Sequence, residues 1–129
     1  MTSFAFDLPA AVRGEDPAIL VTGIFAQPDG EPYDFTGDTF EMPIGLRRSD
    51  DADVDALTTL TSADSEIAWG DATTASGDTG TQFTFRISAE KIALLTPAAS
   101  YIADLFRTSG GDRTRFAEVT LPVKGAVSA

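Results

Sequence analysis

The chain has 129 residues, a length that suits one domain with its own core. It contains no cysteine and no histidine, which excludes disulfides, thiolate chemistry and the commonest general base and metal ligand. Its formal net charge of −11 disfavours nucleic acid and anionic membranes as partners, because both attract clustered Lys and Arg. The sequence also predicts no secretion signal and no membrane-spanning run.

The first third of the chain reads as strands separated by turns. Residues 4–8 alternate apolar and polar and end at a proline, which predicts a strand within an N-terminal arm at 1–11. Residues 19–25 are apolar and largely β-branched, which predicts a strand packed on both faces or nearly so. Proline, aspartate and glycine cluster in residues 27–32 and predict a turn.

Residues 40–46 alternate cleanly and predict the next strand. Pro43 has no N–H for a ladder hydrogen bond, so we expect this strand to lie at a sheet edge or to contain a bulge. Two more short strands are predicted at 57–61 and 66–69. The residues expected to face the core from the strand at 40–46 are Phe40, Met42, Ile44 and Leu46.

Residues 70–80 are rich in Gly, Ser, Thr and Asp, which predicts a flexible surface loop. Residues 81–87 alternate again and predict a strand. Ser88 is a suitable N-cap, so one short helical turn is expected near 88–95. The inward-facing residues of the strand at 81–87 are expected to be Phe83, Phe85 and Ile87.

Two final strands are predicted at 100–107 and 113–123, joined by a hairpin turn at 109–112 and followed by a short tail at 124–129. The whole pattern is all-β: about seven or eight short antiparallel strands with one helical turn in a single domain. A helical turn before a late strand fits an immunoglobulin-like β-sandwich. Periodicity alone leaves a jelly roll or a barrel open.

One acidic segment has the spacing of metal ligands. Asp51, Asp53 and Asp55 alternate as carboxylates do at the start of a calcium-binding loop. The pattern then breaks, because Ala56 stands where a sharp turn needs glycine and Ser62 stands where a bidentate glutamate belongs. A solvated acidic loop is the better interpretation, and no cofactor is predicted.

A second motif suggests catalysis but has a simpler explanation. Ser88 and Lys91 fit the Ser-x-x-Lys pattern of acyl-enzymes, without the companion motifs of that chemistry. An N-cap serine followed by one exposed turn explains the same residues. We therefore expect no catalytic residues and no enzymatic activity.

The remaining side chains of note are aromatic or basic. Most aromatics fall on predicted strands and are expected in the core, whereas Tyr33 and Trp69 lie near loops. Arg47 and Arg48 form a small basic spot in an acidic chain, suited to pairing with nearby aspartates or with a partner.

Several short motifs occur in a characteristic order along most of the chain. Together they resemble the N-terminal immunoglobulin-like domain of bacteriophage baseplate upper proteins. The sequence departs from that pattern where Phe35 replaces Leu, Ala103 replaces Tyr, and Ala99-Ser100 replaces Gly. The matching motifs are Arg13-Gly14-Glu15, Asp29-Gly30, Asp34-Phe35-Thr36-Gly37, Arg47 and Tyr101-Ile102-Ala103-Asp104-Leu105.

The resemblance implies a function in assembly. It predicts a virion structural protein, made in the host cytoplasm, that docks on other virion proteins of the tail, baseplate or capsid exterior. The family's long fibre-forming region has no counterpart here, which predicts a small docking or decoration subunit that forms a homo-oligomer or is present in several copies in the particle. The residues expected at the protein interface, from their position alone, are Phe40, Met42, Ile44, Arg47 and Arg48.

Two other classes of function remain open at this point. A carbohydrate-binding module for host adhesion would need exposed aromatic side chains or a calcium site. An acidic inhibitor that mimics nucleic acid would need carboxylates spaced along one face. The acids of this chain are scattered among predicted loops, which favours the docking hypothesis over the mimic.

Overall fold

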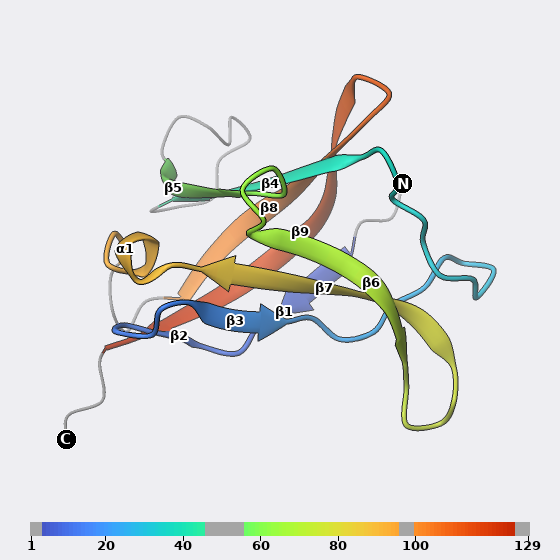
Figure 1. The fold of residues 1–129 in the computed structure, drawn as a ribbon, viewed down its shortest axis with the longest axis horizontal. Coiled ribbons are helices and arrows are strands. Elements are labelled where there is room, and N and C mark those ends of the chain that lie inside the picture. The colour runs from blue at the N-terminus through green and yellow to red at the C-terminus, as the bar shows by residue number, and fades with distance from the viewer. Residues whose placement is uncertain (1–3, 46–55, 96–99, 126–129) are drawn as a thin grey trace.

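The computed structural model describes residues 4–45, 56–95 and 100–125. These residues form two β-sheets packed face to face, with one short helix, α1 (Ala89–Ile92) (Figure 1). The smaller sheet contains β3 (Ala18–Val21), β6 (Ile67–Thr73) and β7 (Thr79–Ile87). The larger sheet contains β1 (Phe4–Asp7), β2 (Ala11–Val12), β4 (Thr39–Gly45), β5 (Ala56–Thr61), β8 (Ser100–Ser109) and β9 (Asp112–Lys124).

The strand order confirms the predicted β-sandwich. The larger sheet runs β1-β9-β8-β4-β5, with β2 also on β9, and the smaller sheet runs β3-β7-β6. This division of the strands is that of immunoglobulin-like sandwiches. One expectation was wrong, because β1 and β2 pair with β9 in parallel rather than antiparallel. No hairpin connects them to β9, so the direction of pairing is not fixed by a turn.

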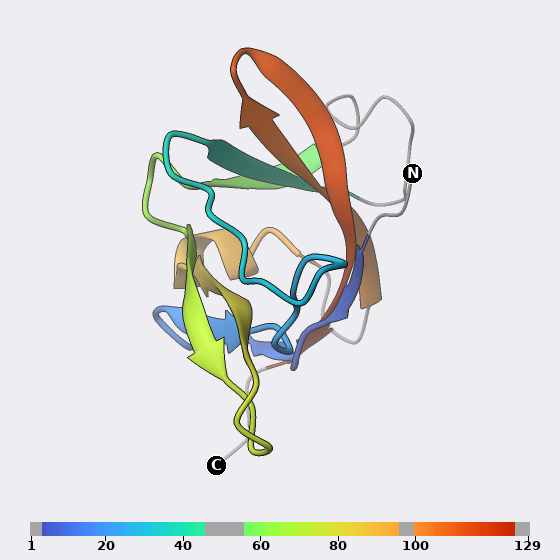
Figure 2. The same ribbon diagram turned by 90° about the vertical axis from the view of Figure 1, so that its right-hand side faces the viewer.

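The core is aromatic and is centred on Phe35, which is 1% exposed. Phe35 belongs to the connection between β3 and β4, which passes between the two layers at one end of the sandwich (Figure 2). Its ring stacks on Phe83 at 5.6 Å between centroids and meets Phe40 and Phe116 edge-on at 5.0 and 5.4 Å. Phe83 lies in the smaller sheet and the other two in the larger, so Phe35 joins the layers.

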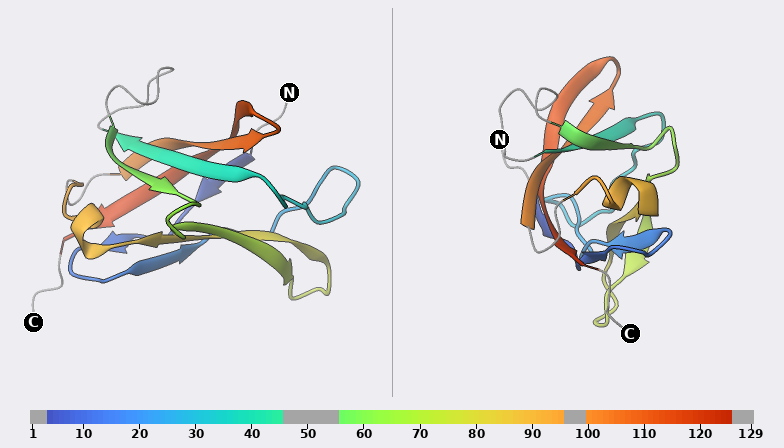
Figure 3. Two further views of the ribbon diagram at one scale, coloured as in Figure 1. Left: turned by 45° about the horizontal axis from the view of Figure 1, so that its top comes forward. Right: turned by 90° about the vertical axis from the view of Figure 1, so that its left-hand side faces the viewer.

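The segment 70–80 is not the loose loop that its composition predicts. β6 and β7 continue through it as a hairpin that extends beyond the sandwich (Figure 3). The ladder reaches Thr73 opposite Thr79, and the turn closes with hydrogen bonds between Thr74 and both Gly77 and Asp78. Polar residues suit this ribbon because both of its faces meet solvent, so polarity does not distinguish it from a loop.

Pro43 is accommodated inside the sheet rather than at its edge. β4 lies between β8 and β5, which contradicts the edge expectation, while the register shift at Ile44 and Gly45 confirms the bulge. The Phe40 carbonyl accepts from the Ser62 N–H and the Phe40 N–H donates to the Ser62 hydroxyl, so the Phe40 backbone faces β5 and by alternation the Pro43 nitrogen points away from it. On that side the ladder with β8 spans only Thr39 to Glu41, so proline removes no hydrogen bond.

Gly80 and Gly70 make a matched pair that tests how closely residues 24 and 25 pack against β7. A Cβ on Gly80 would lie 2.6 Å from the Phe25 carbonyl oxygen and 2.7 Å from an Ile24 methyl, whereas one on Gly70 meets nothing within 4 Å. We expect Gly80→Ala to lower the free energy of unfolding by about 2 kcal/mol. Gly70→Ala should change it by less than about 0.5 kcal/mol. Urea unfolding followed by circular dichroism measures both, and equal effects would contradict the close approach.

Candidate functional site

The outer edge of β3 is open. Among the described residues β3 pairs only with β7, and it forms one side of the smaller sheet. The Thr22 N–H donates to the Phe83 carbonyl at 3.0 Å, which sets the alternation of the ladder. By that alternation the backbone N–H and C=O groups of Ile19 and Val21 point away from β7. The edge therefore presents an unpaired row of donors and acceptors.

The side chains along this edge are apolar and exposed. Ile19 is 56% and Val21 45% exposed, while Ala18 and Leu20 between them are buried in the core. The expectation of a strand packed on both faces was wrong, because nothing in the described chain covers the outer face of the smaller sheet. Thr84 and Arg86 of β7 lie opposite these two residues.

The end of the edge is held rigidly. The Phe83 N–H donates to the Thr22 hydroxyl at 3.1 Å, and the Gln82 side-chain amide donates to the Thr22 carbonyl at 2.8 Å. Such an edge is suited to receive an extended peptide as an additional strand, with main-chain hydrogen bonds for affinity and apolar contacts for selectivity. We call Ile19, Val21 and their outward backbone groups the β3 edge.

The interface residues expected from the sequence do not form this surface. Phe40, Met42 and Ile44 are 3%, 0% and 0% exposed, so as contacts for a partner they were wrong. The separate prediction that these three side chains face the core is confirmed. The other two candidates, Arg47 and Arg48, lie outside the described residues.

The β3 edge was missed because four consecutive apolar residues fit a buried strand and an edge strand equally well. One signal was present in the sequence. Residues 17–28 contain no charge, in a chain with 29 charged residues among 129. A long uncharged stretch that only partly enters the core leaves apolar surface for another contact.

The calcium candidates Asp51, Asp53 and Asp55 lie outside the described residues, so the structure does not place them. Within the residues that it does place, no three acidic side chains come together as metal ligands. The described helix α1 has four residues, and no helix in the described ranges has the length and hydropathy to cross a membrane.

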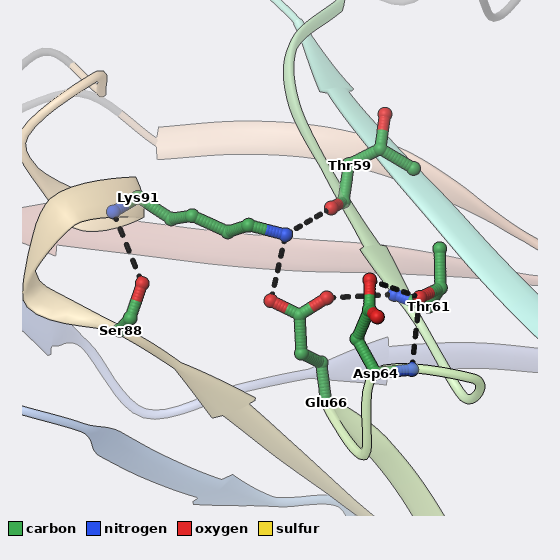
Figure 4. A network of polar contacts seen from close by, with 6 residues as sticks. All are labelled: Thr59, Thr61, Asp64, Glu66, Ser88 and Lys91. Atoms are coloured by element: carbon green, nitrogen blue, oxygen red, sulfur yellow. Dashed lines mark hydrogen bonds and ion pairs between the residues drawn. The ribbon is translucent and has the colours of Figure 1, made fainter.

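The Ser-x-x-Lys motif has structural contacts. Ser88 caps α1, with its hydroxyl accepting a hydrogen bond from the Lys91 N–H, which confirms the predicted N-cap. The Lys91 ammonium points the other way, 2.7 Å from a Glu66 carboxylate oxygen and 2.6 Å from the Thr59 carbonyl oxygen (Figure 4). The second Glu66 oxygen accepts from the Thr61 N–H, so the lysine ties α1 to the β5–β6 turn.

Removing the ammonium tests this link. We expect Lys91→Met to lower the free energy of unfolding by about 1 to 2 kcal/mol, because it leaves the half-buried Glu66 carboxylate and the Thr59 carbonyl without this donor. The matched control is Glu90→Met, at an exposed position of the same helix, which should change stability by less than about 0.5 kcal/mol. Equal losses in urea unfolding would contradict the bridging role.

The motifs that carry the family resemblance shape turns. The Arg13 guanidinium donates to the Ala93 carbonyl at 2.7 Å, and Gly14 has φ +96°, a conformation that favours glycine. Asp34 accepts hydrogen bonds from the N–H and hydroxyl of Thr36 in the turn that delivers Phe35 to the core. These residues fix the ends of strands and the aromatic centre, which is a structural use of each motif.

A partly buried ion pair between Asp38 and Arg107 joins the turn that precedes β4 to β8. Arg107 contacts one Asp38 oxygen through Nε and Nη2, at 2.7 and 2.6 Å. The pKa of Asp38 is held below its ordinary value of 3.8, chiefly by a hydrogen bond from the Ser109 side chain and further by Arg107, against the opposing effect of burial. The pKa of Asp34 is also lowered, by its hydrogen bonds from Thr36.

The lowered pKa of Asp38 predicts an acid-sensitive contribution to stability. Because the folded pKa is below the unfolded one, that contribution is complete above about pH 5, where the unfolded carboxyl is also ionised, and is lost as the pH falls through the folded value. Asp38→Asn should therefore cost stability at pH 6 and cost less at pH 3, in urea unfolding at each pH. Ser109→Ala should reduce the difference between the two pH values, and a cost independent of pH would contradict the assignment.

Comparison with known proteins leaves the site to be argued from its geometry. No protein-family model matches the chain, and no curated protein matches it significantly in sequence.

Proposed function

We propose that this chain is a bacteriophage virion structural protein that docks on other virion proteins through the β3 edge. The observation that carries the proposal is the unpaired, apolar outer edge of β3. The immunoglobulin-like sandwich and the order of the phage-like motifs support placing this docking module in a virion. Its partners are other virion proteins, and it is present there in several copies.

The chemistry of the other sheet edges supports the choice of β3. Natural proteins protect edge strands with charge, proline, bulges or covering segments. The outer strand β6 carries Asp71, β1 carries Asp7, and the Thr59 carbonyl of β5 is occupied by Lys91. Among the described residues, β3 is short but has no charge, proline or bulge and no second pairing strand, and it presents Ile19 and Val21. A strand left unprotected in this way fits a surface that is covered after assembly.

Docking proceeds by strand addition. An extended segment of the partner hydrogen-bonds to the outward backbone groups of Ile19 and Val21 and lays apolar side chains over theirs. The net charge of −11 favours a partner whose flanking surface is basic and repels acidic ones. The rate of association therefore falls as salt concentration rises, since the attraction is screened.

A matched pair of substitutions tests the docking surface. Val21 and Ile102 are both 45% exposed, but Val21 lies on the β3 edge and Ile102 on the outer face of the larger sheet. We expect the amount of Val21→Lys in purified particles to be at least about tenfold lower than that of the natural chain, because a lysine on an edge strand opposes pairing. Ile102→Lys should be incorporated like the natural chain. Quantitative mass spectrometry of heads and tails separated from those particles measures both.

The same experiment can overturn the proposal in two ways. Absence of the natural chain from both heads and tails would contradict the virion function and favour the acidic inhibitor. Incorporation of Val21→Lys at the natural level would contradict docking through β3. Both variants should show circular dichroism and urea unfolding close to those of the natural chain, so loss of the fold cannot explain a difference between them.

A further inference from the structure

A second surface lies on the side of the sandwich where β5 turns into β6. Two adjoining hollows open there, of about 430 and 260 Å³, and they share Thr39, Phe40, Ser62 and Ala63 in their walls. The larger hollow has the size of a small-molecule site. We call the pair the Trp69 hollow, because Trp69 forms part of the wall of the larger one.

Trp69 is well placed to contact a ligand. It lies on β6, opposite Phe83 of β7, and its half-buried side chain is the chain's only tryptophan. Its ring meets Phe35 edge-on at 5.2 Å and 87°, so the buried core holds the indole in one orientation. An indole that is fixed by the core and partly exposed supplies a large apolar surface at little entropic cost.

The polar groups around the indole are fixed as well. The Ser62 hydroxyl accepts a hydrogen bond from the Phe40 N–H at 2.9 Å, and the Ser62 N–H donates to the Phe40 carbonyl at 2.9 Å. The hydroxyl still has its own hydrogen to donate. Thr39 adds a second hydroxyl and Asp38 a carboxylate to the same wall. The hollow thus combines one aromatic wall with several hydrogen-bonding groups held by the backbone.

The charges of the hollow balance. Among the residues that the structure describes, the charged side chains that line it are Asp38 and Glu41. Arg107 pairs with Asp38 at 2.6 Å, and Arg113 pairs with Glu41 at 2.6 Å. A site with paired charges offers no net attraction to an anion or a cation, and it suits a neutral ligand with many hydroxyls.

We propose that the Trp69 hollow binds one sugar ring of a neutral saccharide, with the ring's C–H groups against the indole and its hydroxyls on Ser62, Thr39 and Asp38. An apolar ring face and a rim of hydroxyls are the two surfaces that this wall complements. The site does not involve the β3 edge. Its ligand is bound independently of docking.

Trp69 is also the reporter for the test, because all of the tryptophan emission comes from it. The probes are glucose, galactose, mannose, rhamnose and N-acetylglucosamine, with glucuronic acid and glucosamine as charged counterparts. We expect at least one neutral sugar to shift the emission saturably, with a dissociation constant in the millimolar range, and to bind more tightly than the charged sugars. No shift with any neutral sugar would overturn the proposal, and so would equal binding of charged ones.

Two alanines provide the matched variants. Ala63 lines both hollows and Ala75 lies in the β6–β7 turn, and both are exposed. Ala63→Arg should abolish binding by filling the hollow, and Ala75→Arg should leave it unchanged. Ser62→Ala should weaken binding about five-fold through loss of one hydrogen bond. Binding that survives Ala63→Arg would place the sugar elsewhere and overturn the assignment.

These outcomes are separate from those of the docking test. Val21→Lys should bind the sugar like the natural chain, since β3 is the opposite outer strand of the smaller sheet from β6. Failure of sugar binding with retained incorporation into particles would overturn only the saccharide site. Absence of the natural chain from particles, or incorporation of Val21→Lys at the natural level, with retained sugar binding would overturn only the docking proposal.

Discussion

Burial of Phe35 between the two sheets is the constraint on which the rest of the structure depends. Its ring contacts Phe40 and Phe116 of the larger sheet and Phe83 and Trp69 of the smaller one. Removing such a buried ring typically costs about 3 to 5 kcal/mol, a large share of the stability of a domain this size. The layers are joined by an aromatic residue from a connection, in a chain that has no cysteine for a disulfide between sheets.

The same ring organises the surface above it. The Arg107 guanidinium lies 4.9 Å from the Phe35 centroid and holds the Asp38 carboxylate, while the Trp69 ring meets Phe35 edge-on. The wall of the Trp69 hollow is therefore an extension of the core. This explains how a hollow open to solvent can have fixed side chains, which ligand binding requires.

The open edge has a topological cause. In the described chain β1 and β2 pair with β9 in the larger sheet, so no earlier strand is left to cover β3. Gly80 lets residues 24 and 25 approach β7 closely, where Phe25 bridges to Thr81, but this contact begins after β3 has ended. The four residues of β3 thus remain with one ladder and one free side.

The sequence predicts where the strands are better than it predicts which strands pair with one another. Alternation at residues 40–46 and 81–87 identifies core strands, because periodicity reports which side chains face inward. It does not report which strand lies at an edge. The strand β4 was expected at an edge or with a bulge, and only the bulge is present, while the β3 edge was missed. The composition of residues 70–80 predicted a loop where the β6–β7 hairpin lies, because the two exposed faces of the hairpin also favour polar residues. The Trp69 hollow depends on contacts between β4, the β5–β6 turn and β6, which no local pattern contains.

Amide hydrogen exchange of residues 18–22, measured by NMR on the isolated chain, tests the central claim most directly. An open β3 edge predicts rapid exchange at Ile19 and Val21 and slow exchange at Leu20, because of these three residues only Leu20 donates into the ladder with β7. Protection of all three amides in dilute solution would mean that the outer side of β3 is already covered, and would contradict docking through that edge.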